Sequence, residues 1–198
     1  PLRSDYISEK LDVTGIKAID VACGGGLLAE SLHLKGAEMT GVDISDVAIH
    51  TATIHAEKQG LEIKYLNCEA EDLLPAEKES YDLVTCLEAI EHVPDPAKLV
   101  ETCSNLCKPG GTIVFSTINR NPKSFLFAII GAEYILNLLP KGTHEYKKFI
   151  KPSELSSMMR DNSLEVIEVI GMSYNPITKN YWLGKDVDVN YLIHAKKK

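Results

Sequence analysis

Short apolar runs alternate with longer amphipathic segments along almost the whole chain. The apolar runs have the length of single buried strands, and the segments between them carry apolar residues at helical spacing. Strands are predicted near residues 17–22, 38–42, 62–66, 81–86, 111–118, 164–171 and 188–195. Helices are predicted near residues 5–11, 26–35, 45–59, 95–107 and 152–160. This alternation is typical of an α/β protein with a doubly wound sheet, and we expect residues 1–198 to form a single domain.

One segment interrupts the alternation, between the fifth predicted strand and the helix that begins at Pro152. This insertion spans residues 119–151 and contains a mostly apolar stretch, residues 125–139, which we expect to be helical. A helix that is apolar on most of its faces is either buried or at an interface. The stretch is shorter than the roughly 20 apolar residues that a bilayer span requires.

A glycine-rich turn joins the first predicted strand to the helix that follows it. The strand contains Asp20, and the turn contains Gly24, Gly25 and Gly26. Glycines allow positive φ angles and let a ligand approach the backbone closely. The second predicted strand ends in Asp43, whose carboxylate can accept hydrogen bonds from both hydroxyls of a ribose. Together these features predict a nucleoside site at the carboxyl ends of the strands.

Two classes of ligand fit such a turn. Gly24, Gly26 and Ala29 match the dinucleotide fingerprint G-x-G-x-x-G/A, which would indicate a nicotinamide-dependent oxidoreductase. Asp20 favours the other class, because a carboxylate beside the turn repels a pyrophosphate and attracts an ammonium or sulfonium group. S-adenosylmethionine is a nucleoside that carries both cations. We therefore expect it to be the cofactor.

Composition narrows the function further. A chain of 198 residues with 44% hydrophobic content can bury a core without disulfides or metals. The formal net charge of −7 and the pI near 5.4 argue against a nucleic-acid-binding surface, since phosphate contacts need clustered Lys and Arg. The five cysteines are odd in number and sparse, so free thiols are expected.

Eight short motifs along the chain are shared with one known family. They are Asp-Val-Ala-Cys-Gly-Gly-Gly at 20–26, Gly-Val-Asp at 41–43, Glu-Ala-Ile-Glu-His-Val-Pro-Asp-Pro at 88–96, Leu-Cys-Lys-Pro-Gly-Gly at 106–111, Thr-Ile-Asn-Arg at 117–120, Pro-Lys-Gly-Thr-His at 140–144, Lys-Phe-Ile-Lys-Pro at 148–152 and Tyr-Asn-Pro at 174–176. With these motifs the chain resembles the ubiquinone-biosynthesis O-methyltransferase family over essentially its whole length. The motifs at 140–144 and 174–176 are specific to that family.

The resemblance implies a Rossmann-like sheet of seven strands with the last strand antiparallel. It also implies methyl transfer from S-adenosylmethionine to a phenolic hydroxyl of polyprenylated precursors, 2-polyprenyl-6-hydroxyphenol and 3-demethylubiquinol. The family's cofactor contacts correspond to Arg3, Ala22, Asp43 and Leu87. Ala22 is a departure, because many relatives have glycine there and the loop must accommodate one extra methyl group.

Class I methyltransferases usually contact the adenine ring just after the third strand. This chain has Glu69, Ala70 and Glu71 there. The backbone of Ala70 and an acid such as Glu69 are therefore candidate adenine contacts. A solvated acidic loop is the alternative.

Glu88, Glu91 and His92 have the spacing i, i+3, i+4, which would place all three on one face of a helical turn. They could then bind Mg²⁺, as the resemblance implies for eukaryotic members, or Zn²⁺ in an open site. In the alternative interpretation, His92 lies over the substrate pocket and the glutamates cap the turn or are solvated. Both interpretations remain open at this stage.

The expected chemistry calls for a base. A phenol has a pKa near ~10, so forming phenolate at neutral pH costs about 4 kcal/mol. His92 is the first candidate base, with Glu91 beside it as a further candidate catalytic residue, and a bound cation acting as a Lewis acid is the alternative. The resemblance adds His144, in the family-specific motif at 140–144, as a further candidate.

A polyprenyl tail is insoluble in water, so we expect the protein to meet its substrate at a membrane surface or on other ubiquinone-biosynthesis enzymes. The apolar insertion is a candidate lipid-facing lid, and burial against the sheet or in a dimer interface is the alternative. The expected location is the bacterial cytoplasm or the matrix side of the mitochondrial inner membrane. Methylation of another small phenol or amine, and a catalytically inactive scaffold, are the remaining functional alternatives.

Overall fold

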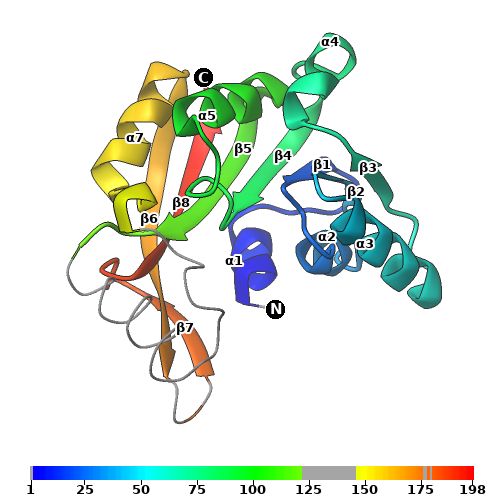
Figure 1. Cartoon of the computed structure of the whole chain (residues 1–198), viewed down its shortest axis with the longest axis horizontal. Helices are drawn as coiled ribbons and strands as arrows, with labels where there is room; N and C mark the ends of the chain where they lie inside the picture. The colour runs from blue at the N-terminus through cyan, green and yellow to red at the C-terminus, as the bar shows by residue number, and fades with distance from the viewer. Residues whose placement is uncertain (1, 122–145, 176–177, 179) are drawn as a thin grey trace.

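The protein is described by a computed structural model in which residues 2–121, 146–175, 178 and 180–198 are placed. A single eight-stranded sheet forms its centre, with the strand order β3-β2-β1-β4-β5-β8-β6-β7 (Figure 1). The strands are β1 Lys17–Val21, β2 Glu38–Asp43, β3 Lys64–Asn67, β4 Tyr81–Leu87, β5 Cys107–Ile118, β6 Leu164–Asn175, β7 Asn180–Gly184 and β8 Asn190–Lys197. Strands β1 to β5 pair in parallel, whereas β8 is antiparallel to both β5 and β6. The predicted antiparallel last strand is confirmed.

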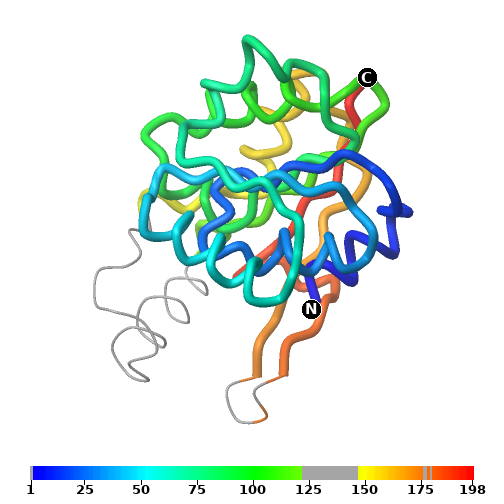
Figure 2. Tube along the Cα trace, turned by 90° about the vertical axis from the view of Figure 1, so that its right-hand side faces the viewer, coloured from blue at the N-terminus to red at the C-terminus, as the bar shows by residue number. Residues whose placement is uncertain are grey.

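Helices cover both faces of this sheet. They are α1 Leu2–Lys10, α2 Leu27–His33, α3 Asp46–Gln59, α4 Leu74–Glu77, α5 Pro96–Leu106 and α7 Pro152–Asp161, with 3-10 turns η1 Ala70–Leu73 and η3 Tyr146–Lys148. In Figure 2, α5 and α7 (green and yellow) lie on the opposite side of the sheet from α1 and α2 (blue). One buried cluster includes Leu99 and Leu155 under α5 and α7, and a second includes Tyr6 and Leu32 under α1 and α2. The predicted doubly wound α/β fold is confirmed.

The sheet has eight strands, so the prediction of seven was wrong by one. The additional strand β7 pairs antiparallel with the end of β6, from Gly171 opposite Gly184 to Asn175 opposite Asn180. The pairing of β6 with β8 stops at Met172. The outer part of the β6–β7 hairpin therefore extends past the body of the sheet (Figures 1 and 2).

The expected helical insertion at residues 119–151 falls mostly outside the described residues. This includes the whole apolar stretch 125–139. Within the described residues, the insertion closes with η3 and the buried side chains of Phe149 and Ile150, and the chain enters α7 at Pro152. The proline suits the first turn of a helix, where its missing N–H removes no intrahelical hydrogen bond.

Candidate cofactor and active site

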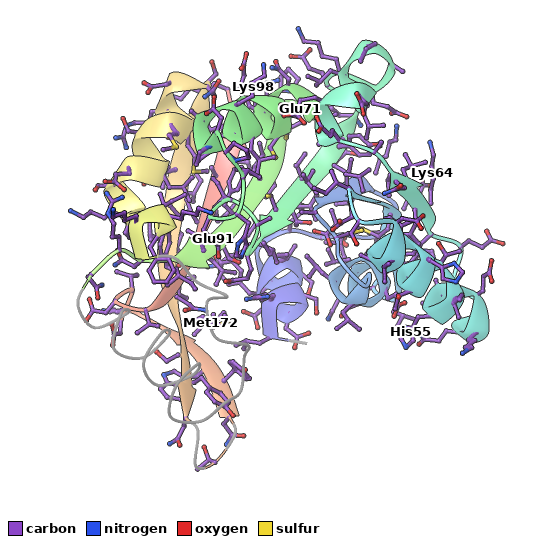
Figure 3. All side chains as sticks on the ribbon, viewed as in Figure 1. His55, Lys64, Glu71, Glu91, Lys98 and Met172 are labelled. Atoms are coloured by element: carbon purple, nitrogen blue, oxygen red, sulfur yellow. The ribbon has the colours of Figure 1, made fainter. Side chains whose placement is uncertain are left out.

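The parallel strands β1, β2, β4 and β5 end at the same edge of the sheet, and the candidate residues gather there. Their pairing registers place Asp20 beside Thr85, and Leu87 beside Ser116. Figure 3 shows Glu91 at this edge, where β4 and β5 end, close to α1. Carboxyl strand ends are where open α/β sheets bind ligands.

The glycine turn between β1 and α2 is tightly folded. Ala22, Gly24 and Gly26 have φ angles of 58°, 53° and 80°, all in the left-handed region. Two backbone hydrogen bonds close the turn, from the Cys23 N–H to the Val42 carbonyl at 3.0 Å and from the Gly26 N–H to the Cys23 carbonyl at 3.0 Å. For an alanine this conformation costs roughly 1–2 kcal/mol. The departure at Ala22 is therefore accommodated at a small cost.

Asp43 joins the turn to the end of β2. Its Oδ2 accepts a hydrogen bond from the Gly24 N–H at 2.9 Å, and its Oδ1 accepts one from the Ser45 N–H at 2.8 Å. Each carboxylate oxygen retains a lone pair for a further donor. The side chain can therefore fix the turn and bind two hydroxyl groups of a ligand at the same time.

A cavity of about 360 Å³ opens beside Asp43. Its lining residues are Val21, Ala22, Val42, Asp43, Ile44, Cys68, Glu69, Ala70, Glu71, Val93, Pro94, Asp95, Lys98 and Leu99. The cavity thus brings together four predicted cofactor residues, Ala22, Asp43, Glu69 and Ala70. Its volume is within the range of small-molecule sites.

Sequence analysis missed one wall of this cavity, formed by residues 93–95 and the first turn of α5. Asp95 caps that helix, because its Oδ1 accepts a hydrogen bond from the Lys98 N–H at 3.1 Å. Lys98 and Glu71 lie near each other at this side of the molecule (Figure 3). Residues 93–95 belong to the shared motif at 88–96, and their place in that motif could have identified them as part of the site.

Asp20 is completely enclosed at the end of β1. Its Oδ1 accepts a hydrogen bond from the Thr85 hydroxyl at 2.7 Å. Burial raises the pKa of Asp20 to about 7, while that hydrogen bond and the nearby charge of Arg3 oppose the rise. A buried carboxylate with so few donors is stabilised by a cationic ligand.

Arg3 reaches this edge from the first turn of α1. Its Nη2 donates a hydrogen bond to Oε1 of Glu88 at 2.7 Å, and the Ser116 hydroxyl donates to the same oxygen at 2.9 Å. Leu87 precedes Glu88 at the end of β4 and packs against the buried cluster under α1. The predicted residues Arg3, Asp20 and Leu87 therefore lie around the same strand ends.

The predicted helical turn carrying Glu88, Glu91 and His92 on one face was wrong. Residues 88–94 form turns and bends, and Glu88 has a φ of 55°, which is outside the helical region. Glu91 is buried with 3% of its surface exposed, whereas His92 is exposed. Among the described residues, no group of three His, Cys, Asp or Glu side chains is placed to hold a metal ion.

The carboxyl group of Glu91 is buried and hydrogen-bonded. Its Oε2 accepts a hydrogen bond from the Thr117 hydroxyl at 2.7 Å. Burial, and then the negative charge of Glu88, raise the pKa of Glu91 to about 7. A carboxylate with a pKa near neutrality can exchange a proton under physiological conditions. His144, another candidate base, lies outside the described residues.

The prediction of free thiols is confirmed for all five cysteines.

Comparison with known proteins agrees with this fold. A methyltransferase domain family matches residues 19–115. Magnesium protoporphyrin IX methyltransferase from Synechocystis, solved with bound S-adenosylhomocysteine, is 17% identical with a TM-score of 0.71, covering 99% of this chain and 80% of that one. The YcgJ protein of Bacillus subtilis is 18% identical with a TM-score of 0.73, covering 98% and 97%. This fold and the methyltransferase domain match agree with a class I S-adenosylmethionine-dependent methyltransferase, and the curated relatives establish that class for the chain.

Curated relatives identify the family within this class. A relative from Marinobacter nauticus is 56% identical over 198 residues, covering 99% of this chain and 83% of the relative. One from Nitrosospira multiformis is 55% identical over 193 residues, covering 98% and 81%. Both are named ubiquinone biosynthesis O-methyltransferase, and this chain belongs to that family.

Proposed function

We propose that this chain methylates a phenolic hydroxyl of polyprenylated ubiquinone precursors, 2-polyprenyl-6-hydroxyphenol and 3-demethylubiquinol. The observation that carries the proposal is the similarity, over 99% of this chain, to relatives named ubiquinone biosynthesis O-methyltransferase, at 56% identity for the Marinobacter protein. Methylation of another small phenol or amine, and an inactive scaffold, are the competing functions. Nicotinamide-dependent oxidation receives no support from the methyltransferase domain match.

The residues at the strand ends suit S-adenosylmethionine. Asp43 would accept hydrogen bonds from the ribose hydroxyls, and the cavity lined by Glu69 and Ala70 would hold the adenine ring. Asp20 would face the ammonium group, and Arg3 would bind the carboxylate as a charge-assisted hydrogen-bond donor. Gly24 leaves the backbone of the turn without a side chain that would obstruct the ligand, since a Cβ there would meet open space.

When bound, this cofactor supplies an electrophilic methyl group. The protein has to orient the acceptor oxygen and remove its proton. Glu91 is the side chain whose pKa, about 7, is suited to accepting a proton at neutral pH. His92 follows it directly in the same turn and is the second candidate base. Alignment of the two reacting groups can contribute roughly 7–11 kcal/mol.

The residues expected to bind Mg²⁺ do not form a fitting site. The Glu88 carboxylate is bound by Arg3 and Ser116, and Glu91 is buried whereas His92 is exposed. Magnesium prefers an octahedron of oxygen ligands, and no three-residue ligand group occurs among the described residues. We therefore assign no step of the reaction to a metal.

Cofactor affinity should depend on pH through Asp20. The ammonium group of S-adenosylhomocysteine favours the ionised carboxylate, whereas the free protein takes up a proton as the pH falls through about 7. Binding then requires loss of that proton, so affinity should fall by about tenfold for each pH unit below 7 and level off above it. Calorimetric titrations from pH 5.5 to 8.5 measure this dependence. A slope that persists in Asp20→Asn would show that another group causes it.

We further propose that the protein works at a membrane surface, in the bacterial cytoplasm or on the matrix side of the mitochondrial inner membrane. No helix in the described part of the chain is long and apolar enough to cross a membrane. The support is the chemistry of a polyprenylated acceptor, together with the apolar sequence of residues 125–139. Other ubiquinone-biosynthesis enzymes are the alternative source of the substrate.

A methyl-transfer assay tests the proposed substrate. Purified protein is incubated with S-adenosylmethionine labelled in the methyl group and with demethylubiquinol, catechol or an aliphatic amine, with and without anionic lipid vesicles. We expect kcat/KM for the prenylated quinol to exceed that for catechol by at least about tenfold, because the tail adds apolar binding energy. Equal values for catechol or the amine would favour a different acceptor. Cofactor binding without turnover of any acceptor would indicate a scaffold.

Sedimentation with the vesicles tests the membrane proposal separately.

A further inference from the structure

The ion pair between Arg3 and Glu88 ties the N-terminal helix to the centre of the site. It joins the first turn of α1 to the residue that follows β4, with an Nη2 to Oε1 distance of 2.7 Å. Its side chains are only partly exposed, at 32% for Arg3 and 26% for Glu88. Partial burial reduces screening of this pair by solvent and salt.

Glu88 is held in place without any help from Arg3. The Ser116 hydroxyl donates to its Oε1 at 2.9 Å, and its own N–H donates to the Ser116 carbonyl at 2.9 Å. Both contacts come from β5, which lies in the middle of the sheet. The carboxylate of Glu88 is therefore the fixed partner, and Arg3 is the partner that is free to exchange.

Arg3 is incompletely satisfied in this arrangement. Its Nε atom is buried and has no hydrogen-bond partner among the described residues. A buried donor without a partner is unfavourable, and the guanidinium group is shaped to bind a carboxylate through two parallel hydrogen bonds. Glu88 occupies Nη2, so an incoming carboxylate can pair with Nε and Nη2 together only when Glu88 is displaced.

Arg3 also lies close enough to Asp20 for its charge to oppose the rise in the pKa of Asp20. An α-amino acid carries its ammonium and carboxylate groups on the same carbon atom. If Asp20 binds the ammonium group, the partner of the carboxylate has to be a neighbouring cation. Arg3 satisfies this condition, provided that Glu88 releases it.

We propose that Glu88 is a latch residue that holds Arg3 until the α-carboxylate of the cofactor displaces it. This inference rests on the proposed function, because it takes the ligand to be a nucleoside bearing an amino acid. Glu88 and the incoming carboxylate compete for one guanidinium group. In this role Glu88 is a positioning residue that weakens cofactor binding in the resting protein.

Affinity measurements on Glu88→Gln test the latch. The amide keeps an oxygen for the Ser116 hydroxyl but loses the charge that holds Arg3. We expect S-adenosylhomocysteine to bind about twofold to fivefold more tightly to this variant, the range for one partly exposed ion pair. Adenosine lacks the carboxylate, so its affinity should not change. A purely structural role for Glu88 would weaken binding of both ligands or leave both unchanged, and either result would overturn the proposal.

Measurements in an Arg3→Gln protein distinguish the latch from simple repulsion between the Glu88 carboxylate and the carboxylate of the cofactor. In Arg3→Gln there is no cation to release, so adding Glu88→Gln should change the affinity for S-adenosylhomocysteine by less than about twofold. A tightening as large as in the wild-type background would overturn the proposal. Glu154→Gln is the matched control, because Glu154 pairs with Arg120 at a similar exposure on α7. It should leave both affinities unchanged.

If Glu88→Gln does not fold, Glu88→Asp provides a second test, because its side chain is one methylene shorter and lengthens the 2.7 Å contact with Arg3; a smaller tightening for S-adenosylhomocysteine and none for adenosine is then expected. Failure of the proposed function would be recognised differently. In that case the wild-type protein would bind neither S-adenosylhomocysteine nor adenosine, whereas failure of the latch alone leaves wild-type binding intact.

Discussion

Asp43→Ala is expected to bind S-adenosylhomocysteine at least about 100-fold more weakly than the wild-type protein. The substitution removes two acceptors for the ribose hydroxyls, and a hydrogen bond to a charged group contributes about 1.5–3 kcal/mol. Two such bonds correspond to roughly two orders of magnitude in Kd. It also removes the acceptors of the Gly24 and Ser45 N–H groups, which hold the turn against β2. Titration calorimetry at pH 8 measures the loss without interference from Asp20.

Asp46→Ala is the matched control for this prediction. Asp46 is an exposed acid three residues further along, in the first turn of α3, and it does not line the cavity. Its removal should change the affinity by less than about threefold, the effect of one exposed charge near a helix terminus. Equal effects of the two substitutions would show that Asp43 acts only through the overall charge of the site.

Gly26→Ala is expected to lower the melting temperature by about 10 °C. A Cβ atom on Gly26 would overlap the Tyr65 Oη and lie 3.0 Å from the Ala52 Cβ, and the φ angle of 80° adds strain. Overpacking costs about 1–3 kcal/mol and a left-handed alanine about 1–2 kcal/mol. For a chain of this size each kcal/mol shifts Tm by about 2–4 °C. Thermal unfolding followed by circular dichroism gives the value.

Gly25→Ala should leave the melting temperature within about 2 °C of the wild-type value. Gly25 has no heavy atom within 4 Å of its hypothetical Cβ, and its φ lies outside the left-handed region. The two variants add the same methyl group to adjacent positions in one turn. A similar loss of stability in both would mean that Tyr65 does not limit the space at Gly26.

The parts of the fold that are encoded locally were predictable from sequence. Strands β1, β2 and β4 are short apolar runs, and their burial on both faces follows from the hydrophobicity of each run. The glycine turn and Asp43 were predictable because a positive φ and a terminal acid are properties of single residues. Helices α3 and α5 are preceded by the N-cap residues Ser45 and Asp95, which belong to strongly capping residue types.

The errors arose where distant residues decide the structure. Strand β7 was missed because a hydrophobic pattern detects a strand by its buried face, and β7 is largely exposed. Tyr181 and Trp182 retain 57% and 48% of their accessible surface. Its existence depends on pairing with β6 beyond the last contact with β8.

The spacing of Glu88 and Glu91 suggested a helix for a similar reason. Their carboxylates are instead bound by Ser116 and Thr117, two successive residues of β5. These partners are 28 and 26 residues away in the chain. Spacing along the sequence shows which side chains a helix would place on one face. It does not show that hydroxyl donors at the end of a distant strand will bind those side chains instead.

The most direct test of the central claim is a calorimetric titration of the purified chain with S-adenosylhomocysteine, run in parallel with NADH. A site for a cationic, amino-acid-bearing nucleoside predicts saturable binding of S-adenosylhomocysteine, loss of that binding in Asp43→Ala, and no measurable heat with NADH. Saturable binding of NADH, with no binding of S-adenosylhomocysteine, would contradict the assignment of this site to a methyltransferase cofactor.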